Sequence, residues 1–128
     1  MTTLTDLIGS THAAVYTYGI VAAYADDKQS ALNYQAGYRR LRDYLSDVAH
    51  AEGVAVPSAS AAYELPMRIT NNATARTVAA NLENRMCAQW ADALGYEDKL
   101  RTSHFISEPH RAAIRAFSWS GISYAFPS

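Results

Sequence analysis

A long stretch without helical periodicity in the middle of the chain constrains the fold more than any other feature. This stretch runs from Gly53 to Thr70 (GVAVPSASAAYELPMRIT), and two amphipathic helical segments lie on each side of it. At ~3.3 Å per extended residue, about eighteen residues can span the full length of a helix of ~24 residues. We therefore expect an all-α bundle of four helices, with one long crossover between the second and the third.

Four segments carry apolar residues at steps of three and four, which predicts one helix in each. Their expected bounds are Leu4 to Asp26, Gln29 to Glu52, Asn71 or Asn72 to Leu94, and Glu97 to Ser120. Four helices with one long middle crossover describe a ferritin-like bundle. All 128 residues are then a single ferritin-like domain, with the crossover at about 53–71 and a C-terminal tail at 121–128.

A proline inside the fourth segment predicts that this helix is not straight. Pro109 removes a backbone donor and clashes with the preceding turn, so we expect a kinked fourth helix, with the kink or a split near Ser107. The alternative is that Ser107, Glu108 and Pro109 form the capped start of a new segment. The tail that follows Gly121 is expected to fold back over the bundle.

The composition argues against several classes of protein. The net charge is −1, and Arg39, Arg40 and Arg42 are interpreted as a solvated helix face, so no nucleic-acid partner is expected. No apolar run reaches the ~18 residues of a membrane span, and the N-terminus lacks the pattern of a secretory signal. We expect a cytoplasmic protein with no membrane partner.

Ferritin-like bundles often hold two iron or manganese ions, and this chain lacks most of the residues that such a centre needs. A di-metal site takes a carboxylate from each of two helices and a Glu-x-x-His pair from each of the other two. No Glu-x-x-His occurs here, and the one substitute, Asp47-x-x-His50, lies in the last turns of the second helix. The interior is therefore expected to carry too little negative charge for two metal ions.

A smaller set of side chains near the middle of the bundle forms a candidate polar or metal-binding cluster. Its members are His12, Tyr38, Glu83, His104 and His110. We favour a buried polar cluster in which Glu83 is hydrogen-bonded to His12, Tyr38 or Arg39. The alternative is a single iron, manganese or zinc ion held by His12, Glu83 and a histidine of the fourth helix. No catalytic residue and no cofactor are predicted.

Several short motifs are spread over nearly the whole chain. They are HAAVYTYG (His12 to Gly19), YRRLRDYL (Tyr38 to Leu45), YELP (Tyr63 to Pro66), NLE (Asn81 to Glu83), Trp119 and Phe126-Pro127. Their order and spacing resemble an actinobacterial ferritin-like domain family of unknown function. The resemblance implies a four-helix ferritin-like bundle, often dimeric, with no established activity. It also implies an acidic residue before the first-helix histidine and a histidine opening the second motif, whereas Thr11 and Tyr38 stand at those positions here.

The leading hypothesis is a metal-free ferritin-like protein that is a small binding or interaction module and not an enzyme. It is expected to form a homodimer, since nine tyrosines suit an interface. The alternative is a metal-binding or oxidoreductase-like protein with a degenerate mononuclear site at His12, Glu83 and His104 or His110. A weaker hypothesis is RNA contact through the arginines at 39, 40 and 42.

Overall fold

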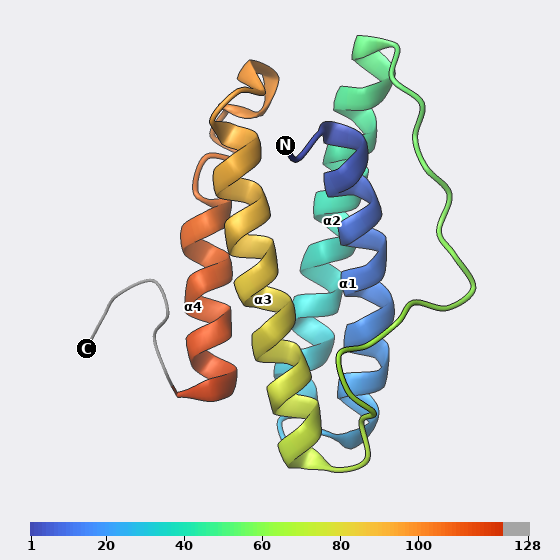
Figure 1. The fold of residues 1–128 in the computed structure, drawn as a ribbon, viewed down its shortest axis with the longest axis vertical. Coiled ribbons are helices and arrows are strands. Elements are labelled where there is room, and N and C mark those ends of the chain that lie inside the picture. Colours follow the sequence, from blue (N-terminus) through green and yellow to red (C-terminus); the bar gives the residue numbers. More distant parts are fainter. Residues whose placement is uncertain (122–128) are drawn as a thin grey trace.

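The computed structural model describes residues 1–121 and is helical throughout its regular parts (Figure 1). Its elements are α1 (Leu4–Tyr24), α2 (Lys28–Glu52), α3 (Asn72–Leu94), a 3₁₀ turn η1 (Asp98–Leu100) and α4 (Glu108–Ser120). None of the described residues lies in a strand. The prediction of an all-α bundle of four helices is confirmed for this part of the chain.

The connector between α2 and α3 determines how the helices run. Figure 1 shows that α1 and α2 are antiparallel and that α3 and α4 are antiparallel. Between the two pairs, the long connector without regular secondary structure returns along the bundle, so α2 and α3 run in the same direction. The connector is held to α1 by a hydrogen bond between His12 Nε2 and the Pro57 carbonyl oxygen, at 3.1 Å. The rings of Tyr16 and Tyr63 lie 5.5 Å apart, and Ile69 is buried. The connector therefore packs on the helices.

Local sequence explains where the helices begin and end. Thr3 and Asp6 form a capping box at the start of α1, and the Asn71 side chain accepts a hydrogen bond from the Thr74 N–H at the start of α3. Gly53 ends α2 with a φ of 69°, a left-handed conformation that only glycine adopts without steric cost. The caps satisfy backbone groups that a helix end leaves without partners.

The expectation of one kinked helix from Glu97 to Ser120 is wrong in its first half. The chain forms the separate turn η1, and α4 begins only at Glu108, with Pro109 in its first turn. Proline is tolerated there because the first N–H groups of a helix have no intrahelical acceptor. Ser107 precedes the helix, as the alternative expected, but its side chain makes no capping hydrogen bond. Of the expected tail, Ile122 to Ser128 lie outside the described residues.

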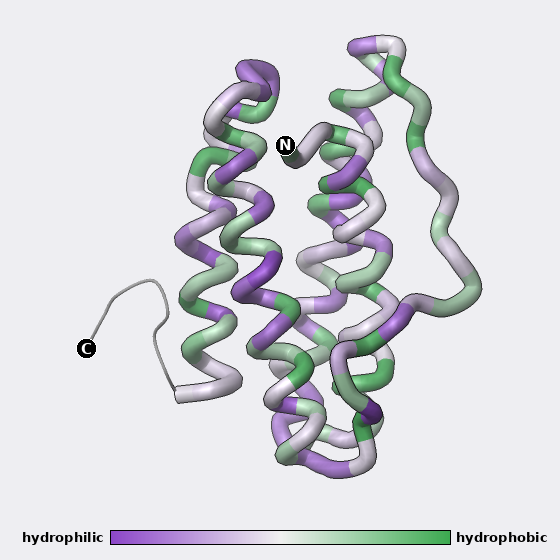
Figure 2. The backbone as a smooth tube through the Cα atoms, in the orientation of Figure 1, coloured by the Kyte–Doolittle hydropathy of each residue, from purple (hydrophilic) through white to green (hydrophobic). Residues whose placement is uncertain are grey.

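The helices differ in how closely they pack. α1 packs on α2 and α3, and α3 packs on α4, whereas the backbones of α2 and α4 lie farther apart and meet through side chains, such as Tyr34 with Ser118 and Tyr38 with Arg115. Hydrophobic and hydrophilic residues are interspersed along each helix, as expected for helices that pack one face on a core (Figure 2). No helix in the described part of the chain combines the length and the apolarity needed to cross a membrane. A groove lies between α2 and α4, beside the core.

Candidate functional site

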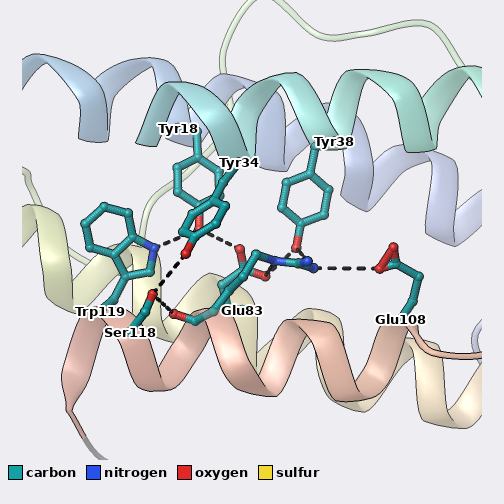
Figure 3. A network of polar contacts seen from close by, with 8 residues as sticks. Tyr18, Tyr34, Tyr38, Glu83, Glu108, Ser118 and Trp119 are labelled. Carbon is teal, nitrogen blue, oxygen red and sulfur yellow. Dashed lines mark hydrogen bonds and ion pairs between the residues drawn. The ribbon is translucent and has the colours of Figure 1, made fainter. Parts of the chain in front are cut away.

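A fully buried carboxylate lies at the centre of the bundle. Glu83 is on α3, one helix position beyond the apolar Leu82, and its exposure is 0%. Its Oε2 accepts a hydrogen bond of 2.5 Å from the Tyr18 hydroxyl of α1, and its Oε1 accepts one from the Tyr38 hydroxyl of α2. Figure 3 shows both tyrosines pointing towards Glu83 from the facing helices. A buried carboxylate needs such donors, because an unpaired charge in the protein interior is costly.

The positive charge that balances Glu83 comes from α4. Arg115 Nε lies 3.1 Å from Glu83 Oε1, an ion pair whose N–H is not aligned for a hydrogen bond. Arg115 Nη2 donates to the Tyr38 hydroxyl at 3.2 Å and lies 3.8 Å from Glu108 Oε2. Burial opposes the charge of this guanidinium, but attraction from Tyr38, Glu83 and Glu108 outweighs it and raises the pKa of Arg115 above its ordinary value. Arg115 is therefore a permanent cation between two carboxylates.

Aromatic side chains surround the ion pair of Glu83 and Arg115. Trp119 Nε1 donates to the Tyr18 hydroxyl at 3.0 Å, and the Tyr34 hydroxyl lies 3.3 Å from Ser118 Oγ (Figure 3). Burial, reinforced by the negative charge of Glu83, raises the pKa of Tyr18 and of Tyr38 well above the ordinary value of 10.0. Both phenols therefore stay protonated near neutral pH and act as hydrogen-bond donors to the carboxylate.

The residues present do not fit a di-metal centre. Both oxygens of Glu83 are already engaged by tyrosine hydroxyls, and a guanidinium lies between Glu83 and Glu108, where a metal ion would need to bind. Within residues 1–121, no group of three or more His, Cys, Asp or Glu side chains gathers in a way that could hold a metal ion. A metal could enter this cluster only by displacing Arg115.

The structure brings together two of the five candidate residues, Glu83 and Tyr38. The proposed hydrogen bond between His12 and Glu83 is not formed, since His12 binds the connector at Pro57. His104 is exposed, and its ring stacks on Tyr44 at 4.8 Å.

The remaining residues considered for this cluster lie at the surface. His110 is exposed on α4, and Arg39 is exposed on α2. The three histidines are thus distributed over the connector interface and the surface: His12 on α1 and His110 on α4 lie on faces turned away from Glu83, and His104 lies in the turn between η1 and α4.

The cluster predicted from the sequence did not include Arg115, Glu108, Tyr18 or Trp119. One signal could have found the first two: Glu108 and Arg115 are seven positions apart on α4, two helical turns, and so share a face with each other. Trp119, four positions beyond Arg115, extends the same face. A buried Glu83 needs a cation nearby, and the face of α4 that carries Arg115 could have been predicted to supply it.

A groove between α2 and α4 reaches this cluster. Its volume is about 500 Å³. The buried residues Tyr38 and Glu108 and the half-buried Arg115 line it on the side of the ion pair. Its other principal walls are Tyr34, Arg40, Leu41 and Tyr44 from α2, with His104, Arg111 and Ile114 from the α4 side. The groove thus joins a charged interior to solvent.

Comparisons with known proteins give a family but no activity. Residues 3–128 match the family described as "Domain of unknown function (DUF4439)". Among solved structures, the chain is similar to a conserved hypothetical protein, rv2844, from Mycobacterium tuberculosis, with a TM-score of 0.83, 27% identity and 92% of each chain covered. No curated protein matches. The predicted resemblance to a family of unknown function is confirmed.

Proposed function

We propose that this chain, which belongs to the DUF4439 family, is a ferritin-like bundle that acts as a small binding module and not as an enzyme. In this proposal an arginine, instead of metal ions, balances the central carboxylate. The course of the chain supports the ferritin-like assignment, because the long connector makes α2 and α3 run in the same direction (Figure 1). Short connections throughout would have made every consecutive pair antiparallel.

The observation that carries the proposal is the position of Arg115 between Glu83 and Glu108. An acid, base or nucleophile must be able to change its protonation or bonding during a reaction. Glu83 is enclosed by two tyrosine donors and a guanidinium, and both tyrosines hold their protons because burial raises their pKa. The centre of the bundle is therefore suited to a structural role, and the open groove beside it is suited to binding.

The same proposal includes a homodimer in the cytoplasm. Leu32 on α2 and Phe117 on α4 are 40% and 51% exposed, and neither lines the groove, so they are available to a second copy. The one cysteine, Cys87, is free, which suits a reducing compartment. Light scattering over a range of concentrations tests the dimer, and Phe117→Glu should shift it towards monomer. A wild-type protein that stays monomeric at high concentration would contradict this part.

Elemental analysis tests the metal-free centre. Wild-type protein purified without chelator should contain iron, manganese and zinc far below one ion per chain. Stoichiometric metal that is lost in Glu83→Ala would overturn the proposal in favour of the mononuclear alternative. Glu64→Ala, which removes an exposed carboxylate of the connector, is the matched control and should leave the metal content unchanged.

A further inference from the structure

We infer that the groove between α2 and α4 binds a flat organic anion that also carries an O–H or N–H donor. This inference deepens the proposed binding role and rests on it. Three independent features of the groove specify the three parts of such a ligand. They are its arginines, an unsatisfied buried carboxylate oxygen, and its aromatic and aliphatic walls.

The arginines select an anion. Arg40 and Arg111 line the groove from opposite sides, are exposed, and form no ion pair with any of the residues 1–121. The third lining arginine, Arg115, is balanced by the buried pair of glutamates. A carboxylate or phosphate lying between two guanidinium groups can accept parallel, charge-assisted hydrogen bonds, which are stronger than neutral ones. Glu108 and the His104 ring are the other titratable groups near this position, together with the lining tyrosines.

A buried acceptor selects the donor. Glu108 Oε2 is buried and has no hydrogen-bond partner among the described residues, and the side chain is 9% exposed. Its nearest cation, Arg115 Nη2, is 3.8 Å away, which is beyond hydrogen-bond distance. Buried polar atoms nearly always have a partner, and Glu108 lines the groove. A hydroxyl or amine of a ligand can supply the missing hydrogen bond.

The walls select a flat, apolar body. The His104 ring stacks on Tyr44 with an angle of 28° between the planes, and this stacked pair forms part of the groove wall. Tyr44 and Ile114 are 45% and 52% exposed although large and apolar, so a ligand would remove apolar surface from water. The volume of about 500 Å³ lies within the ~300–1,000 Å³ of small-molecule sites.

Three related probes test the inference by calorimetry and by intrinsic fluorescence. These are 6-hydroxy-2-naphthoate, which has the anion and the donor, 6-methoxy-2-naphthoate, which lacks the donor, and 2-naphthol, which lacks the anion. The hydroxy acid should bind at one site per chain, about threefold to tenfold tighter than the methoxy acid. It should also bind at least about tenfold tighter than naphthol.

Variants locate the site. Arg111→Gln and Arg40→Gln should each weaken both acids by about threefold to tenfold. Arg39→Gln is the matched control, since it removes the same charge from an exposed position on α2 that does not line the groove. Glu108→Gln should reduce the preference for the hydroxy over the methoxy acid, because the charged acceptor is lost. Circular dichroism confirms that each variant is folded.

Several outcomes would overturn the inference. They are no saturable binding at millimolar probe, equal weakening by Arg39→Gln and Arg111→Gln, or a hydroxy-over-methoxy preference that survives Glu108→Gln. Any of these results rejects this class of ligand. It does not reject the proposed metal-free centre, which the elemental analysis tests separately. Stoichiometric metal, in contrast, rejects the proposed function whatever the probes do.

Discussion

Replacing Arg115 by methionine should destabilise the protein far more than the loss of a surface arginine. Methionine keeps the length and much of the apolar stem but removes the only cation in contact with Glu83 within the described part of the chain. Glu83 is fully buried, so its charge is then left without a counter-ion in the protein interior. Breaking a buried pair in this way costs about 3–5 kcal/mol.

That loss would be a large share of the stability of a small domain, which is typically ~5–15 kcal/mol. For a chain of this size, 1 kcal/mol corresponds to about 3–4 °C in melting temperature, so Tm should fall by roughly 10–20 °C. The matched control is Arg42→Met. Arg42 pairs with Asp43 at 3.3 Å, but the two side chains are 29% and 70% exposed, and such a pair contributes under ~1 kcal/mol.

Denaturant unfolding followed by circular dichroism measures these differences. The double variant Glu83→Gln with Arg115→Met should recover about 2 kcal/mol relative to Arg115→Met, because the fully buried charge of Glu83 is removed together with its cation and only Glu108 is left without Arg115. A loss of stability in Arg115→Met no larger than that in Arg42→Met would contradict the prediction. Additive effects of Glu83→Gln and Arg115→Met in the double variant would contradict it as well.

Three further predictions concern the same cluster. Burial raises the pKa of Glu108 above 4.5, so its contribution to stability is present below pH 4.5 and lost as pH rises through the raised pKa. In Glu108→Gln, the free energy of unfolding should therefore fall less steeply as pH rises above 4.5. Denaturant titrations at several pH values measure this difference. Tyr18 and Tyr38, whose pKa burial raises above 10.0, contribute stability that is lost at alkaline pH. Their tyrosinate absorbance should appear only as helical circular dichroism disappears. Arg115→Ala leaves Glu83 and Glu108 without their cation, so Mn²⁺ or Zn²⁺ should raise the Tm of this variant and not that of the wild type.

The fourth helix and the candidate cluster show where sequence reasoning stopped. Between Glu97 and Ser107 the residues tolerate helix, but Pro109 is equally suited to a helix start, and local pattern could not choose between a kink and a new beginning. Position along a helix gives the face of a residue only relative to its neighbours. That information could not show that His104 and His110 face the surface, or that His12 contacts the connector.

Helix content, most helix ends and the long connector could be read from the amino-acid sequence, because propensity, periodicity and capping depend on residues within one or two turns. Glu83 could likewise be recognised as a carboxylate close to the core face. The identity of its partners could not, since Tyr18, Tyr38 and Arg115 come from three other helices. Only the packing of those helices brings the three side chains within hydrogen-bond or ion-pair distance of one carboxylate, and only the placement of α2 beside α4 forms the groove next to them.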